Sequence, residues 1–329
     1  MKNFKHILGT LFLTALIFTS CSKNNDDADI IFYPSAEDYS NLQNEALEDL
    51  TQNFQFNAED GWINLTSENG VSIGINGSCL TQNGSPVTGQ VDLEFVEIFS
   101  KGSMLVTNKP TMGVMPNGDK ALLLTGGEFF IEATQNGVAL ETNCNIQLGI
   151  PTELTGDPDP EMILWTGTID EDGNLAWEEN KREDGTGPQG DGGGVFTEGN
   201  QYYAFIGDFG WSNVDRFYND PRPKTTILVD VPEGYDNTNC SVFLSYDGED
   251  TGLANLDTYD PVDGLFSEHY GQIPIGLECH VIFVTESAND WKYAIQSVTI
   301  VENGVITITE GETSIVTQSQ LETIINGLP

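Results

Sequence analysis

A run of aromatic and charged residues, FGWSNVDRFY at 209–218, carries the side chains best suited to binding a ligand. Trp211 and Tyr218 supply aromatic rings that can stack on a sugar. Asp215 and Arg216 can accept hydrogen bonds from hydroxyl groups or donate to them. These four residues form our candidate ligand-binding set. The alternative is structural: Asp215 and Arg216 order a turn, and Trp211 fills a joint between modules.

A second group of polar residues has the alternating oxygen ligands that calcium prefers. Asp170, Asp172 and Asn174 could bind the ion. The EF-hand pattern needs glycine at its sixth position, but Gly173 comes fourth in this segment. The alternative is a plain hairpin turn between two strands that each contain a tryptophan. Calcium is the single cofactor that the sequence suggests.

Catalytic motifs are missing from the sequence. No G-x-S-x-G, H-E-x-x-H or P-loop pattern occurs, and His269 and His280 are the histidines outside the leader. With 51 Asp and Glu residues, the supply of acids has no diagnostic weight for a glycosidase. We therefore expect a non-enzymatic protein with a binding or scaffolding role. The alternatives are a surface hydrolase that acts on glycans and a calcium-stabilised adhesion module.

The N-terminus predicts export. Lys2 and Lys5 precede an apolar run at 7–18 that is too short to span a bilayer, which is typical of a signal peptide over residues 1–20. Cys21 directly follows small residues, an arrangement that resembles the bacterial lipobox, although Phe18 departs from the usual aliphatic residue. The resemblance implies that the Cys21 thiol is acylated and anchors the chain in a membrane. The alternative is an ordinary signal peptide followed by an unmodified cysteine.

Residues 21–34 form a polar, acidic stretch that we expect to be a tether. Its sequence SKNNDDADI resembles the signal that carries lipoproteins of the Bacteroidota to the outer face of the outer membrane. Without residues 1–20 the chain keeps 10 Lys and Arg against 51 Asp and Glu. This balance argues against nucleic acid as a partner, because nucleic-acid binding requires a basic surface. The expected partners are the membrane, through the lipid, and an extracellular glycan or protein.

Four cysteines remain after Cys21, and an even number in an exported chain is compatible with disulfides. Of the three possible pairings, the domain division favours Cys79 with Cys144 and Cys240 with Cys279. Zinc binding is disfavoured because no C-x-x-C spacing occurs. Free buried thiols are the remaining alternative.

The pattern of apolar residues predicts a mostly β protein made of two β-sandwich-like modules. Residues 35–52 predict a helix, with Ser35 as its cap and Asp38 as the acidic partner in a capping box. A second short helix is expected within 319–325. Between them, short apolar or alternating runs are separated by turn residues every eight to twelve positions. We expect a helix plus first module over 35–180, a glycine-rich loop or linker over 181–200, and a second module with the C-terminal helix over 201–329.

Several segments together resemble a family of exported Bacteroidota proteins. They are PVTGQVDLEFVEIF at 86–99, LLLTGGEFFIEATQNGVAL at 122–140, MILWTGTIDEDGNLAW at 162–177 and FGWSNVDRFY at 209–218. Glu128 stands where this family commonly has methionine, and Ser212 where it has isoleucine. The first module also distantly resembles the β-sandwich of ankyrins and netrin receptors. The resemblance covers roughly residues 54–300 and supports the fold and the location, but it implies no defined activity.

Overall fold

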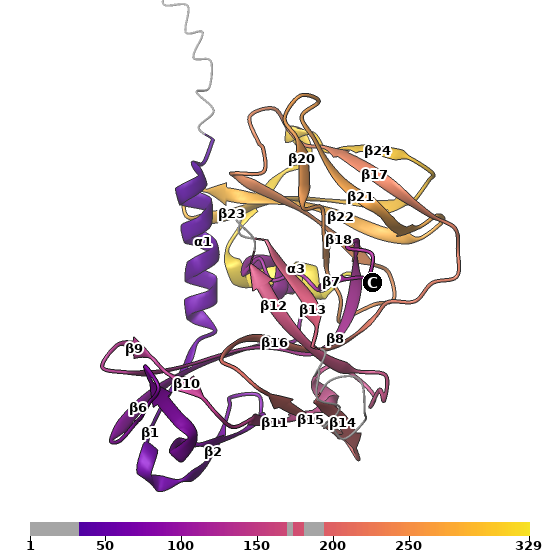
Figure 1. Ribbon diagram of the computed structural model, residues 1–329. Coiled ribbons are helices and arrows are strands. Elements are labelled where there is room, and N and C mark those ends of the chain that lie inside the picture. Colours follow the sequence, from indigo (N-terminus) through magenta and orange to yellow (C-terminus); the bar gives the residue numbers. More distant parts are fainter. Residues whose placement is uncertain (1–32, 170–173, 181–193) are drawn as a thin grey trace, which may run out of the picture. The chain divides into compact units, whose positions relative to one another are not determined.

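The computed structural model describes residues 33–169, 174–180 and 194–329 (Figure 1). Strands dominate these residues, and the sheets face one another in layers, so the prediction of a mostly β, sandwich-like fold is confirmed. Residues 33–329 form one compact unit, and the expected signal peptide and anchor at Cys21 lie outside the described residues.

Helix α1 (Ala36–Asp49) forms where the sequence predicts it. The Ser35 side chain accepts from the backbone N–H of Asp38, whose carboxylate in turn accepts from the backbone N–H of Ser35. This capping box satisfies two backbone donors that a helix start otherwise leaves unpaired. Tyr39, Leu42 and Ala46 follow helical spacing and are buried on one face of the helix.

The first module consists of the sheets formed by β1 to β16. One sheet has eight strands, with the order β1 (Gln52–Asn57), β6 (Gln90–Ile98), β8 (Lys120–Gln135), β16 (Gly210–Phe217), β12 (Ile163–Ile169), β13 (Leu175–Glu179) and β7 (Met112–Val114), and with β9 (Val138–Ala139) beside β8. The facing sheet has the order β14 (Val195–Glu198), β15 (Gln201–Ile206), β11 (Ile146–Pro151), β3 (Ser72–Asn76) and β2 (Trp62–Thr66). A small sheet contains β10 (Glu141–Thr142), β4 (Leu80–Gln82) and β5 (Ser85–Pro86).

The second module consists of the sheets formed by β17 to β25, which carry the orange and yellow colours in Figure 1. One sheet has the order β20 (Thr258–Asp260), β21 (Leu265–Pro274), β17 (Lys224–Asp230) and β24 (Gly304–Thr307). The other has the order β19 (Ala254–Asn255), β18 (Cys240–Tyr246), β22 (Glu278–Ser287), β23 (Asp290–Thr299) and β25 (Ser314–Val316). Each module has its own buried apolar core.

A third apolar core joins the modules. It includes the buried face of α1, helices α2 (Lys101–Val106) and α3 (Gln318–Asn326), and residues of both modules. Trp165 and Trp177 come from the first module, and Phe243 and Trp291 from the second. The sequence predicts α3 but not α2. The two modules therefore share buried surface and are not independent units on a linker.

The predicted module boundary is wrong. Strand β15 pairs with β11, and β16 pairs with β8 and β12, so the first module extends to Phe217 and not to residue 180. The glycine-rich composition of 181–200 correctly excludes a packed core segment there, but β14 begins within that range at Val195. Residues 181–193 lie outside the described residues. They connect two strands of the same module.

The hairpin turn predicted at 135–137 is confirmed. Asn136 and Gly137 have φ values of 53° and 75°, the left-handed conformation that this pair tolerates. Strands β12 and β13 also pair antiparallel as expected, with Ile169 opposite Leu175. The turn between them, residues 170–173, lies outside the described residues.

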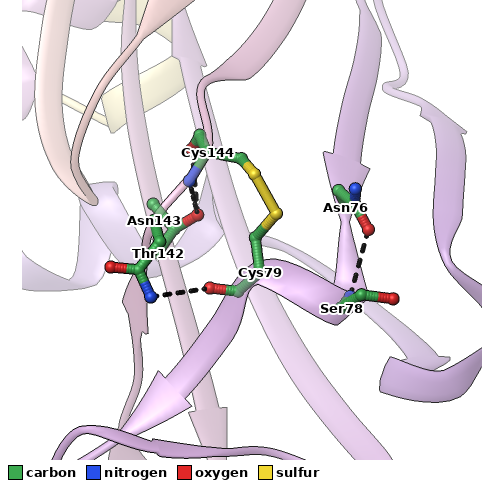
Figure 2. The surroundings of a disulfide bond; sticks show 6 residues. All are labelled: Asn76, Ser78, Cys79, Thr142, Asn143 and Cys144. Carbon is green, nitrogen blue, oxygen red and sulfur yellow. Dashed lines mark hydrogen bonds between the residues drawn. A yellow bond between two sulfur atoms is a disulfide. The ribbon is translucent and has the colours of Figure 1, made fainter.

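One of the two predicted disulfides forms. Cys79 and Cys144 are bonded, with Cα atoms 5.7 Å apart, and the Asn143 side chain donates to the Cys79 carbonyl at 3.5 Å (Figure 2). Cys240 and Cys279 are free and buried, so the prediction of a bond between them is wrong. In the β18–β22 pair Cys240 lies opposite Thr285 and Cys279 opposite Tyr246. Six residues of strand, about 20 Å, therefore separate the two thiols.

Candidate functional site

Strand β16 separates the four residues of the candidate ligand-binding set. Because side chains alternate along a strand, Trp211 and Asp215 point to one face and Arg216 to the other. Trp211 belongs to the third core, and Asp215 is completely buried. Arg216 and Tyr218 line a pocket on the surface. The structure thus brings together two of the four residues and places the other two inside the protein.

Asp215 is part of a buried polar cluster. Its Oδ2 accepts a hydrogen bond of 2.6 Å from the Asn213 side chain, and the Thr125 hydroxyl donates to Asn213 Oδ1 at 2.8 Å. These residues come together because Asn213 lies opposite Glu128 and Asp215 opposite Thr125 in the pairing of β16 with β8. Burial raises the pKa of Asp215 well above its ordinary value. The cluster is closed to solvent, so we do not treat it as a binding site.

Glu128 lies beside this cluster and is also completely buried. Neither oxygen of its carboxylate has a hydrogen-bond partner among the described residues. Burial raises the pKa of Glu128 well above its ordinary value, the negative charge of Asp215 raises it further, and Lys109 opposes both effects. The Lys109 ammonium group donates to the carbonyl of Thr107 at 3.0 Å and lies 5.5 Å from the centre of the Trp211 ring. Trp211 therefore packs against a buried cation and does not offer its ring to a ligand.

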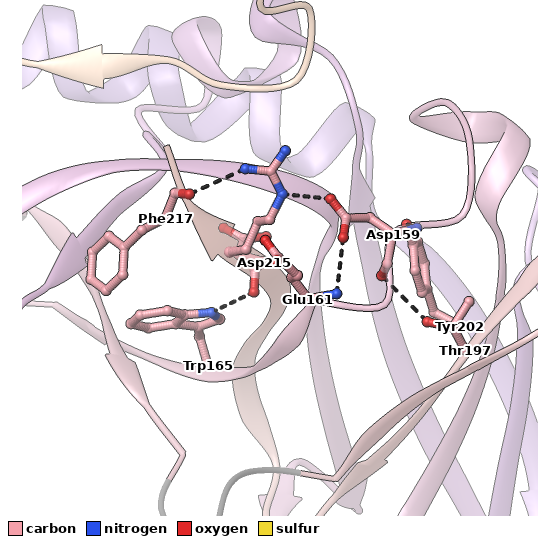
Figure 3. Close-up of polar contacts among 8 residues, drawn as sticks. Asp159, Glu161, Trp165, Thr197, Tyr202, Asp215 and Phe217 are labelled. Carbon is pink, nitrogen blue, oxygen red and sulfur yellow. Dashed lines mark hydrogen bonds and ion pairs between the residues drawn. The ribbon is translucent and has the colours of Figure 1, made fainter. Parts of the chain in front are cut away.

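Arg216 is fixed by contacts on its own face of the strand. Its Nε donates to Asp159 at 2.5 Å, and its Nη1 donates to the carbonyl of Phe217 at 3.2 Å (Figure 3). Asp159 also accepts from the backbone N–H of Glu161 at 2.9 Å. Partial burial acts to raise the pKa of Asp159, but the Glu161 N–H and the Arg216 guanidinium together hold it below its ordinary value. The carboxylate therefore stays ionised and positions the guanidinium.

The pocket beside Arg216 has a volume of about 400 Å³. Its polar lining includes Arg216, Lys224, Asn219 and Glu161, which together supply hydrogen-bond donors and an acceptor. Its apolar lining comes mainly from aromatic and aliphatic side chains, among them Trp165, Ile163, Phe217 and Tyr218. A surface of this kind can bind a molecule that has an apolar ring face and hydroxyl groups around its edge.

Tyr218 has a supporting role at this pocket. Its hydroxyl donates to Asp220 at 3.1 Å, and its ring meets that of Tyr246 edge-on with the ring centres 5.3 Å apart. Asp220 is also bound by Arg222, whose guanidinium lowers the pKa of that carboxyl far below its ordinary value. The ring of Tyr218 is therefore held in place from both ends.

Sequence reasoning missed the other polar residues of the pocket. Lys224 begins β17, and Asn219 lies in the connection between the modules. A usable signal was the scarcity of basic residues, because a lysine close to Arg216 is a notable feature in so acidic a chain. The carboxylate of this pocket is Glu161, as far as the structure describes its lining. A glycoside hydrolase uses two carboxylates about 5–10 Å apart, so the pocket gives no support to the hydrolase hypothesis.

The remaining predicted sites fall largely outside the described residues. Asp170 and Asp172 of the calcium hypothesis do, whereas Asn174 lies at the start of the hairpin strand β13. Within the described residues no group of three or more His, Cys, Asp and Glu side chains is arranged to hold a metal ion. No helix in the same ranges combines the length and apolar character that a bilayer span requires.

Comparison of the chain with known protein families finds no family profile that matches it, and comparison with curated proteins likewise finds no match.

Proposed function

We propose that this chain is a lipid-anchored binding protein of the outer membrane, exposed at the cell surface, and that it binds an extracellular glycan in the Arg216 pocket without catalysing a reaction. One observation carries the proposal. Arg216 and Lys224, two of the 10 basic residues that follow the predicted leader, line a single pocket with aromatic walls.

The chemistry of the lining supports a hydroxyl-rich ligand. Sugar hydroxyls both donate and accept hydrogen bonds, so they need both kinds of partner. Arg216, Lys224 and Asn219 donate, and Glu161 accepts. The aromatic side chains supply the flat apolar surface on which the ring of a sugar packs. Because Arg216 is fixed by Asp159, little conformational entropy is lost when a ligand binds to its guanidinium.

The location is supported by the predicted signal peptide, by Cys21 and by the acidic stretch that follows it. Expression of Cys21→Ser tests the anchor. We expect this variant to leave the membrane fraction and to lose the acyl mass from its N-terminus. Retention of the variant in the membrane would contradict lipid anchoring.

Glycan-array binding of the mature Cys21→Ser protein tests the pocket. Lys224→Gln removes an exposed donor and should weaken binding of any glycan that the parent protein retains by about tenfold, the loss of one charged hydrogen bond. Lys23→Gln removes the same charge from the predicted tether and should have no effect. Equal binding by the two variants would exclude the Arg216 pocket, and a parent protein that retains no glycan would overturn the proposed function.

A further inference from the structure

A second cavity lies beneath helix α1, away from the residues that line the Arg216 pocket. Its volume is about 490 Å³. Its walls come from α1, from the turn after α2, from the ends of β12 and β13, and from the loop that leads into β18. Both modules therefore contribute to it, and its size is in the usual range for a small-molecule site.

The lining of this cavity has an unusual composition for so acidic a protein. Its described residues include no carboxylate, although the chain has 51 Asp and Glu. Most of the lining residues carry a neutral amide or hydroxyl group, such as Gln43, Asn44, Asn108, Asn237 and Ser241. Groups of this kind bind neutral hydroxyl-rich molecules, because each can donate or accept a hydrogen bond without a charge.

The cation at the cavity is balanced from behind. Lys109 lines the cavity, and the buried carboxyl group of Glu128 attracts its ammonium group from inside the protein. Thr107 accepts one hydrogen bond from the ammonium group through its carbonyl oxygen. A ligand in the cavity consequently meets a charge that already has its counterion, which favours a neutral molecule over an acidic one.

Asn108 supplies an unsatisfied polar atom. Its side-chain oxygen is buried and has no hydrogen-bond partner among the described residues, which costs about 1–3 kcal/mol in a folded protein. The residue is held in the left-handed conformation at φ 52° by the turn that ends α2. A hydroxyl donor from a ligand would satisfy this oxygen.

The walls of the cavity are already ordered by hydrogen bonds. The N–H and the hydroxyl of Thr238 both donate to Asp236, at 2.8 and 2.6 Å. The Asn239 side chain donates to the carbonyl of Pro34 at 3.3 Å and so ties this loop to the segment before α1. Little rearrangement is needed to bind a ligand, since the loop and the helix are held in place without one.

We propose that this cavity is a second binding site, which takes one neutral, hydroxyl-rich molecule the size of a simple sugar. The inference does not rest on the glycan-binding role of the Arg216 pocket. Because the cavity has walls from both modules, binding there stabilises the joint between them and raises the melting temperature of the protein.

Isothermal titration calorimetry of the mature Cys21→Ser protein with glucose, glucuronate and glucosamine tests the site, together with melting curves. We expect glucose to bind and to raise the melting temperature. Glucuronate should bind more weakly because the Lys109 charge is already balanced, and glucosamine more weakly because the lining offers its ammonium group no carboxylate. No binding of glucose at millimolar concentration, or tighter binding of either charged sugar, would overturn the proposal.

Asn108→Gly removes the side-chain oxygen and keeps a residue that tolerates positive φ, so the fold should survive. We expect glucose affinity to fall about tenfold. Asn83→Gly is the matched control, since Asn83 has φ 50° and does not line the cavity. Lys224→Gln separates the two sites: it should leave glucose binding in this cavity unchanged. Glucose binding that is lost with Lys224→Gln and kept with Asn108→Gly would place the site elsewhere and contradict the inference.

Discussion

Lys101 and Ser245 form a buried hydrogen bond of 3.0 Å that links helix α2 to strand β18 of the second module. The Lys101 ammonium group also donates to the carbonyl of Leu328 at 3.4 Å. Burial lowers the pKa of Lys101, while the acidic residues Asp250, Asp247 and Glu249 oppose that shift. This contact and the third apolar core couple the two modules energetically.

We predict that the modules unfold together. Lys101→Met keeps the apolar stem of the side chain but leaves the Ser245 hydroxyl without its donor, so it should lower the free energy of unfolding by about 1–3 kcal/mol. Calorimetry should show one transition in both proteins, at a lower temperature in the variant. Two separate transitions in the parent protein would contradict the coupling, and the exposed Lys224→Gln change serves as the control.

We predict that Glu268 makes the protein less stable as the pH rises towards neutrality. Burial raises the pKa of Glu268 to about 7, and the charges of Asp257 and Asp119 add to the shift, although the N–H groups of Gln272 and Gly271 oppose it. The folded state therefore favours the protonated carboxyl. That stabilisation is complete below the ordinary pKa of 4.5 and is lost as the pH rises to about 7.

Glu268→Gln removes this titration. Urea unfolding at pH 4.5 and at pH 8 should show a decline in stability that is smaller in the variant, by up to about 3 kcal/mol. The exposed Glu302→Gln change should leave the decline as it is in the parent protein. An unchanged decline in Glu268→Gln would show that this carboxyl does not titrate abnormally.

We predict that the Cys79–Cys144 disulfide stabilises the first module. The bond closes a loop of 65 residues, and chain-entropy theory gives about 4 kcal/mol for a loop of that length. The double variant Cys79→Ser, Cys144→Ser should lose stability of that order in denaturant titrations. A loss below about 1 kcal/mol would contradict this role.

The thiol count provides a separate check on the same structure. Cys240 and Cys279 are buried, and burial raises the pKa of Cys279 to about 12. Neither thiol should react with a maleimide in the native protein, and both should react after unfolding without reductant. Mass spectrometry that finds no free thiol after unfolding would restore the pairing that the sequence favoured.

We predict that Gly127 is required by the T-G-G sequence of β8. It has φ 136°, and a Cβ atom there would lie 2.6 Å from the rings of Phe129 and Phe99. Gly127→Ala should therefore cost at least about 2 kcal/mol, from backbone strain and from overpacking. Gly311→Ala, where the added atom meets nothing within 4 Å, should be nearly neutral in the same thermal melts. Equal stability of the two variants would contradict the prediction.

Local signals in the sequence were enough to predict much of the fold. The capping pair Ser35 and Asp38 defines the start of α1, and the Asn136–Gly137 pair defines a turn, because each depends on neighbouring residues alone. Helix α2 was missed since it has six residues and no apolar period long enough to detect. The second disulfide was mispredicted because pairing depends on strand register, which the order of cysteines does not reveal.

The candidate site was half predicted for a related reason. The aromatic and charged residues of 209–218 were chosen as a group, but alternation along a strand sends Asp215 and Arg216 to opposite faces. Lys224 lies in another module, and the sequence contains no local pattern that connects it to Arg216. The cavity beneath α1 needs contacts among four separate segments, so no sequence window could predict it.

The segment that enters α1 is fastened to the second module before the helix begins. The Tyr33 ring lies 5.2 Å from the ring of Tyr235, and the carbonyl of Pro34 accepts from Asn239. Tension applied through the chain that precedes Tyr33 reaches these contacts first, and only then the helix. Two points of attachment at the entry of α1 thus act as a strain relief, which shields the fold behind them from mechanical load.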